Sequence, residues 1–117
     1  DVYLMYAEAT LRGASSGDIT KALGYVNKIR LRAKAGVITA SDLTLDFLLD
    51  ERGRELYWEA HRRQDLIRFG MLAGSQYVWN WKGSVNGSAL PNTINLYPIP
   101  FDQLVMNPNL KQNPGYN

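Results

Sequence analysis

The chain has 117 residues, no cysteine and a formal net charge of +2. The lack of Cys excludes disulfide bonds, thiolate metal sites and a cysteine nucleophile, and a charge this close to balance does not predict binding to nucleic acid. No apolar run approaches the roughly 18 residues that span a bilayer.

The first third of the sequence predicts two helices joined by a short turn. Residues 1 to 12 and 18 to 34 each carry apolar side chains at helical spacing, with Gly13 as a stop between them and Asp18 as a negative charge at the second start. A connection this short predicts an antiparallel helical hairpin. Because the chain opens inside a helical pattern and without Met, we expect it to be part of a longer protein.

A third, strongly charged helix is expected next. Ser41 or Thr44 can cap it, and its pattern runs to about Ala60 and, with a bend, to Phe69, where Gly70 ends it. Its apolar stripe consists of Leu45, Leu48, Leu49, Leu56 and Ala60.

The composition changes after Gly70, because Gly, Asn, Pro and Ser become frequent. We expect residues 71 to 117 to be loop-rich, with one short turn at Phe101 to Met106 and an extended tail lying on the helices. The fold class is therefore mainly α: one domain with a helical part at 1–70 and a loop-rich wrap at 71–117.

The charged string between residues 51 and 70 has two interpretations. Carboxylates recur every four residues, and arginines lie three or four residues from them, which favours a structural ion-pair network between helices. Paired carboxylates also hydrolyse glycosides, so a catalytic acid and base is the alternative. The residues concerned are Glu51, Arg52, Glu55, Glu59, Arg62, Arg63 and Asp65.

His61 is the single histidine of the sequence. A zinc site of the H-E-x-x-H kind needs a second histidine at helical spacing, and none exists. We therefore expect His61 to be structural, near the bend, and we predict no metal site.

Tyr77, Trp79 and Trp81 alternate along the chain. In an extended segment all three rings would point to one side and Asn80 and Lys82 to the other. Such a row can form a platform for sugar rings; the alternative is that it fills the core beneath a long loop.

Three blocks of the sequence, in this order, resemble the SusD/RagB family. They are VYLMYAEA at 2–9 with VNKIRLRA at 26–33, ERGRELYWEAHRRQDLIRFG at 51–70, and LYPIP at 96–100 with NPNLKQNPGY at 107–116. A small departure is Ala60, where the family often has Gly. Since family members are several times longer, the resemblance is to roughly the last quarter, the C-terminal portion.

This family consists of glycan-capturing outer-membrane lipoproteins, so the resemblance implies a function. It implies tetratricopeptide-like helix pairs and non-enzymatic binding of oligosaccharides, without a cofactor. The WNWKG segment is most similar to starch-binding members and implies a starch-type α-glucan. The alternative is a helical protein-interaction scaffold without sugar contact in this chain.

The resemblance also implies a location and partners. The protein would be exposed at the surface of the cell outer membrane, lipid-anchored through an N-terminal Cys that is missing here. Its partners would be a SusC-like TonB-dependent transporter, which it covers as a lid, the oligosaccharide, and the remainder of its own parent chain.

Overall fold

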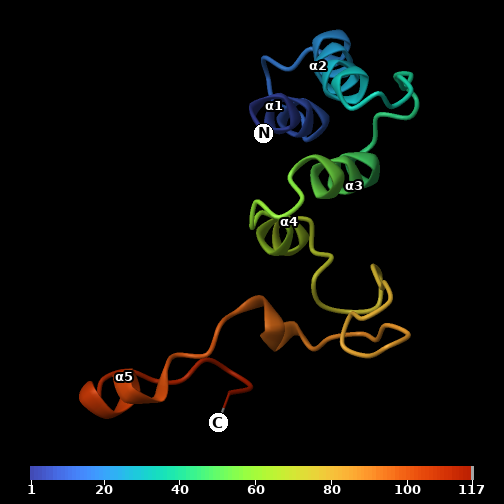
Figure 1. Ribbon diagram of the computed structural model, residues 1–117. Helices are drawn as coiled ribbons and strands as arrows, with labels where there is room; N and C mark the ends of the chain where they lie inside the picture. Colours follow the sequence, from blue (N-terminus) through green and yellow to red (C-terminus); the bar gives the residue numbers. More distant parts are fainter. Residues whose placement is uncertain (117) are drawn as a thin grey trace. The chain divides into compact units, whose positions relative to one another are not determined.

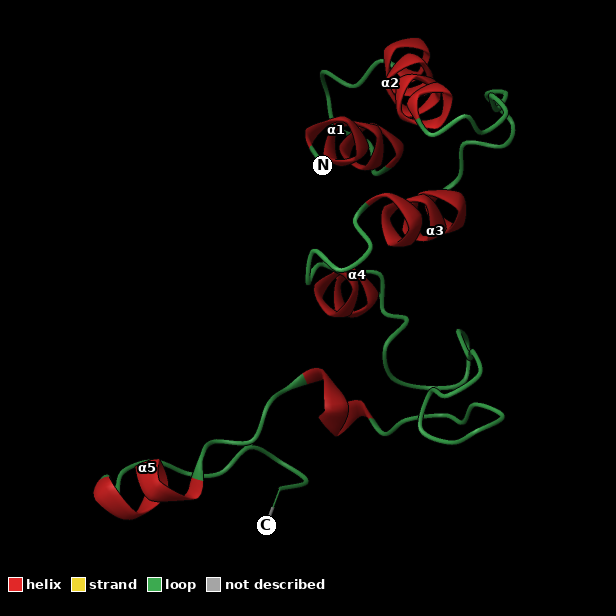
Figure 2. Ribbon diagram, in the orientation of Figure 1, coloured by secondary structure: helices red, strands yellow, loops and turns green. Residues whose placement is uncertain are grey.

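A computed structural model describes residues 1–116 of the chain (Figure 1). Within these residues it contains five α-helices and one short 3-10 helix, and the rest is loop (Figure 2). The helices are α1 Val2–Leu11, α2 Ile19–Arg32, α3 Leu45–Glu55, α4 Arg62–Arg68, η1 Asn92–Asn95 and α5 Phe101–Met106.

The described residues form no β-strand, and their only bridge pairs Gly74 with Leu90. The expectation of a mainly α chain is confirmed. None of the helices in residues 1–116 has the length and apolar character needed to cross a lipid bilayer.

Two compact units make up the chain: residues 1–65, and the part from Leu66 onward. The first unit holds α1, α2, α3 and the beginning of α4, whereas the second holds η1, α5 and the loops around them.

Local capping explains where the helices of the first unit begin. The Asp18 carboxylate accepts hydrogen bonds from the backbone N–H groups of Thr20 and Lys21 at 2.8 and 3.1 Å, which satisfies donors that a helix start leaves open. At α3 the cap is Thr44 rather than Ser41, since its hydroxyl accepts from the N–H of Phe47 at 3.1 Å. Gly13 follows α1 with φ 89°, a conformation that suits glycine.

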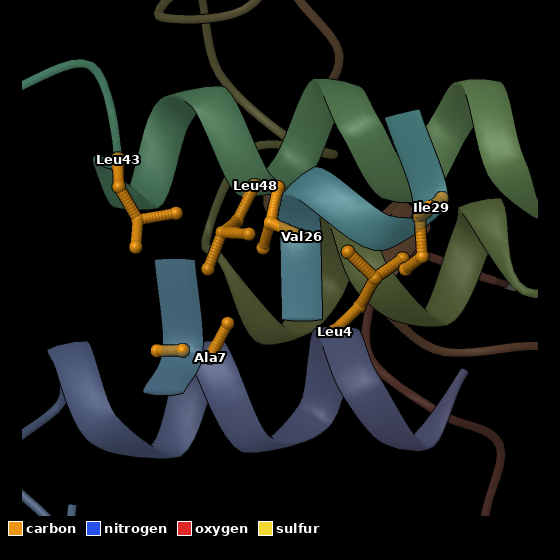
Figure 3. Close-up of a cluster of buried hydrophobic side chains, with 7 residues drawn as sticks. Leu4, Ala7, Val26, Ile29, Leu43 and Leu48 are labelled. Carbon is orange, nitrogen blue, oxygen red and sulfur yellow. The ribbon is translucent and has the colours of Figure 1, made fainter. Parts of the chain in front are cut away.

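The core of the first unit lies where α1, α2 and the start of α3 meet. In Figure 3, Leu4 and Ala7 of α1 point toward Val26 and Ile29 of α2. Leu43, just before α3, and Leu48, within α3, complete the cluster on the opposite side. Each of these side chains is less than a tenth exposed. Full burial of a Leu, Ile or Val side chain is worth about 1.5–3 kcal/mol, so this cluster holds the three helices together.

The connection between α2 and α3 is tied back by polar side chains. The Asn27 amide donates to the carbonyl of Ile38 at 3.0 Å and accepts from its N–H at 2.8 Å. Further along, Thr39 donates both its hydroxyl and its backbone N–H to the carboxylate of Asp42. These two hydrogen bonds lower the pKa of Asp42.

The third helix is shorter than its charge and apolar pattern predicts. It ends at Glu55, a turn occupies 56–61, and a separate helix starts at Arg62. Trp58 and Ala60 adopt φ values of 67° and 62°, and the left-handed conformation cannot continue a right-handed helix. The expected run to Ala60 was therefore wrong, although the bend leading to a second segment is present.

Hydrogen bonds from the side chains of Gln112 and Tyr116 connect separate segments of the second unit. Gln112 accepts from the N–H of Ile99 at 2.8 Å and donates to its carbonyl at 2.9 Å. The Tyr116 hydroxyl donates to the carbonyl of Leu96 at 2.9 Å. These contacts join the residues after η1 to the tail that follows α5. At Phe101–Met106, where a short turn was expected, the structure forms the helix α5.

Candidate functional site

The aromatic segment lies in the second unit, within the loop that follows α4. The rings of Tyr77 and Trp79 are 5.7 Å apart between centroids, with their planes tilted by 58°. Tyr77 is half-buried, Trp79 is 40% exposed and Trp81 is 75% exposed. The segment therefore offers a tilted pair of rings and one further exposed ring, instead of a filled core.

The backbone of this segment is a turn and not an extended strand. The N–H of Lys82 donates to the carbonyl of Trp79 at 3.0 Å, and Trp81 donates to Val85 at 3.2 Å. Trp81 has φ 75°, which is rare for a bulky residue. A flat row of three rings on one side, as an extended segment would give, is consequently not formed.

The Lys82 side chain turns inward and lies against the Trp79 ring. It is 2% exposed, and its ammonium donates to the backbone carbonyls of Met71 and Tyr77 at 3.2 and 2.5 Å. The same nitrogen lies 5.0 Å from the centroid of the Trp79 ring. The extended arrangement would have put Lys82 on the side opposite to Trp79, so its position against that ring was missed from the sequence. The sequence feature that could have indicated this position is that Lys82 stands between the aromatic residues and Gly83, which favours a turn.

The carboxylates of α3 meet guanidinium groups from α2 and from α3 itself. Glu51 accepts from Arg30 at 2.9 Å and from Arg54 at 2.6 Å, while Glu55 accepts from Arg32 at 2.6 Å. Glu51 is 5% exposed. These pairs link the end of α2 to the C-terminal half of α3.

A second group of charges joins α3 to the chain start and to α4. Arg52 donates to Asp65 and to Asp1, each at 2.8 Å. The Arg62 guanidinium donates to the carbonyl of Leu49 at 2.7 Å and lies 3.8 Å from Asp50.

Gly53 makes room for this second group. A Cβ at Gly53 would come within 2.9 Å of Arg62, so glycine there lets the guanidinium lie against α3. The turn after α3 leaves Glu59 exposed, and no ion pair reaches it among residues 1–116. Arg63 lies half-buried at the start of α4.

An open hollow of about 690 Å³ lies beside the turn that separates α3 from α4. Four arginines line it, namely Arg52, Arg54, Arg62 and Arg63. Tyr57 and Trp58, 75% and 88% exposed, border it. Their exposure was not anticipated from the sequence, because a continued helix would have given them a different direction.

The described residues hold no group of three histidine, cysteine or acidic side chains arranged for a metal ion. His61 lies half-buried in the turn before α4, where its carbonyl accepts from the N–H of Asp65 at 3.0 Å. Glycosidases place two carboxyl groups across a substrate bond, whereas Glu51 and Glu55 here face guanidinium groups. These two carboxylates are therefore already paired with cations.

Comparison with known proteins identifies a family model and several similar chains. The SusD family model matches residues 1–116. The chain is 41% identical over 117 residues to the starch-binding protein SusD of Bacteroides thetaiotaomicron, covering 99% of the chain and 20% of that protein. It is 36% identical over 126 residues to the SusD-like protein P25 of Formosa agariphila, covering all of the chain and 23% of that protein.

A solved structure agrees with this match. A SusD superfamily protein from Bacteroides vulgatus superimposes with a TM-score of 0.73 at 36% identity, covering 99% of this chain and 26% of that one. The chain thus spans about a fifth to a quarter of the length of the relatives it matches. On the family model, the sequence identity and the shared fold together, the chain belongs to the SusD family.

Proposed function

We propose that this chain forms part of a non-enzymatic protein that binds oligosaccharides of the starch type. The observation that carries the proposal is the 41% identity, along the whole chain, to a protein named for starch binding. The exposed rings of Trp79 and Trp81 supply the contact surface. In this proposal the protein stands at the surface of the outer membrane, lipid-anchored, and delivers the glycan to a SusC-like TonB-dependent transporter.

The aromatic rings have the chemistry that such a ligand requires. Sugar rings present C–H groups on their faces, and aromatic side chains combine a large apolar surface with a polar edge. Tyr77 and Trp79 form a tilted pair of rings, so two neighbouring sugar units of a curved glucan could contact them in turn. Trp81, 75% exposed, adds a third contact that remains accessible.

The ion pairs around α3 support the non-enzymatic part of the proposal. Glu51 receives two guanidinium groups and Glu55 one, so these carboxylates already have partners. Glu59 is exposed in a turn. A hydrolase would instead direct two carboxyl groups at a shared substrate bond.

Calorimetric titration of the protein at its full natural length tests the sugar contact. Soluble starch is the ligand and a β-glucan is the control ligand. We expect Trp79→Ala and Trp81→Ala each to weaken starch binding about tenfold, which is ~1.4 kcal/mol and the size of one aromatic contact. Trp58→Ala is the matched control, because Trp58 is 88% exposed with φ 67° but lies in the other unit.

Three outcomes separate the possibilities. Loss of starch binding in the Trp79 and Trp81 variants, with Trp58→Ala unchanged, supports a site on this segment. Full binding by both variants would move the sugar site away from this chain. No heat with starch would overturn the α-glucan as ligand, and binding of the β-glucan instead would replace it.

A second candidate function is a helical interaction scaffold without sugar contact. The hollow beside the α3–α4 turn favours it, because exposed Tyr57 and Trp58 border four arginines there. Tyr, Trp and Arg are the residues that dominate binding energy at protein interfaces. If Trp58→Ala abolishes co-purification of the transporter while starch binding is unchanged, the scaffold function is supported.

A further inference from the structure

Lys82 is a buried cation with no acidic partner among residues 1–116. It is 2% exposed, and no carboxylate of residues 1–116 lies within 4 Å of its ammonium nitrogen, whereas the buried arginine of the first unit pairs with Asp65 and Asp1. A buried ammonium group is unfavourable unless other groups replace its hydration. Its burial therefore needs a reason in the structure around it.

Two backbone carbonyls and one aromatic ring replace the hydration of the Lys82 ammonium group. The Lys82 ammonium donates to the carbonyl of Tyr77 at 2.5 Å and to that of Met71 at 3.2 Å. It also lies 5.0 Å from the centre of the Trp79 ring, which is within the range of a cation–π contact. The Lys82 ammonium nitrogen thus contacts both the backbone of Tyr77 and the ring of Trp79.

The backbone of Lys82 holds the other side of the loop. Its N–H donates to the carbonyl of Trp79 at 3.0 Å, and its carbonyl accepts from the N–H of Ser88 at 2.6 Å. The Ser88 hydroxyl reaches the same carbonyl at 3.4 Å. Side chain and main chain of Lys82 together connect four points of one loop.

We infer that Lys82 is a positioning residue for glycan binding, acting through the Tyr77–Trp79 pair. This inference rests on the proposed function of that pair. The ammonium fixes the tilt of Trp79 relative to Tyr77 before the ligand arrives, so ordering of the rings need not be supplied by the binding energy. Without it, both rings remain in the chain but lose their fixed arrangement.

A double-mutant cycle tests whether Lys82 acts through Trp79. Lys82→Met keeps the length and removes the charge and the donors. We expect it to weaken starch binding about tenfold in the otherwise unchanged full-length protein, and less than twofold when Trp79→Ala is already present. Lys111→Met is the matched control, since Lys111 is an exposed lysine of the same unit, and we expect it to leave binding unchanged.

Lys82→Arg provides the conservative variant. A guanidinium group donates to carbonyls and stacks on aromatic faces, so we expect it to restore binding to within about threefold of the unsubstituted protein. Far-UV circular dichroism establishes that each variant is folded. If neither Lys82 variant folds, Lys82 is required for the fold as a whole and the inference is overturned.

The outcomes distinguish this inference from the proposed function. Loss of binding in Trp79→Ala with full binding in Lys82→Met overturns the inference and leaves the sugar site in place. Full binding in Trp79→Ala overturns the sugar site and the inference with it. Equal losses from Lys82→Met in both backgrounds would show a general effect on the loop, and would also overturn the positioning role.

Discussion

Arg52 and Asp65 form an ion pair whose two side chains are each 4% exposed. Removing one member of a buried pair leaves the other with less compensation for its lost hydration, which typically costs about 3–5 kcal/mol. Arg52→Met keeps most of the apolar volume and removes the guanidinium group from both Asp65 and Asp1. We expect it to lower the free energy of unfolding by about 3 kcal/mol, measured by urea denaturation.

Arg54→Met is the control for this prediction. Arg54 also pairs with a buried carboxylate, that of Glu51, but its own side chain is 56% exposed, and Glu51 keeps its hydrogen bond from Arg30. Pairs with an exposed partner contribute about 0–1 kcal/mol. Equal losses from the two variants would show that burial of the pair does not set its contribution.

Within one charged string, equal spacing gives unequal surroundings. Glu51, Glu55 and Glu59 are each four residues apart, yet the first two accept hydrogen bonds from arginines and the third is exposed. The helix ends at Glu55, so Glu59 lies in the turn beyond it and not beside the guanidinium groups that contact Glu51 and Glu55. Helical spacing indicates contacts only as far as the helix continues.

At the scale of elements, the turn between α3 and α4 carries local strain. Ala60 has φ 62°, a conformation that is unfavourable by about 1–2 kcal/mol for a residue with a Cβ. Glycine adopts it freely, although it loses more conformational entropy on folding. We expect Ala60→Gly to raise the free energy of unfolding by about 1 kcal/mol, measured by urea denaturation.

Ala9→Gly is the matched control for the turn. Ala9 is exposed inside α1, where glycine is unfavourable by about 1 kcal/mol. The same change of residue should thus stabilise the chain at position 60 and destabilise it at position 9. A loss of stability at both positions would mean that the left-handed turn is not the state that Ala60 occupies in solution.

The sequence predicted a helix start at Asp18 and, with Ser41 as the alternative, at Thr44, because capping and apolar spacing agree there. A short turn was expected at Phe101–Met106, and the structure forms the helix α5 there without a side-chain cap. The end of α3 was not predicted, because Leu56 and Ala60 continue the helical pattern. The backbone nevertheless becomes left-handed at Trp58 and Ala60. Tertiary contacts decide such a position, and local periodicity does not report them.

The candidate site shows the same division. The aromatic residues Tyr77, Trp79 and Trp81 stand out from the sequence alone, since they alternate in a loop-rich region. Their arrangement in space could not be predicted from the sequence, because it depends on Trp81 adopting φ 75° and on the Lys82 side chain reaching Met71, eleven residues away. Sequence spacing identified the rings, and only the structure gave their orientation.

At the scale of the whole molecule, each unit leaves large apolar side chains in solvent. On α1, Val2 and Met5 are 74% and 54% exposed, and on α5, Phe101 and Met106 are 77% and 79% exposed. Apolar patches exposed at a protein surface often mark contact sites. The relatives that the chain matches are four to five times longer, so additional chain could cover these faces there.

The 117-residue chain produced alone should therefore self-associate. We expect sedimentation velocity to show a concentration-dependent shift to larger species, and the double variant Val2→Ser with Met5→Ser to reduce it, because burial of apolar area drives such association. Val37→Ser is the matched control: Val37 is 61% exposed but lies in the loop after α2 and not on α1. A monodisperse monomer at all concentrations would contradict the prediction, since the exposed side chains of α1 would then be tolerated in water without any cover.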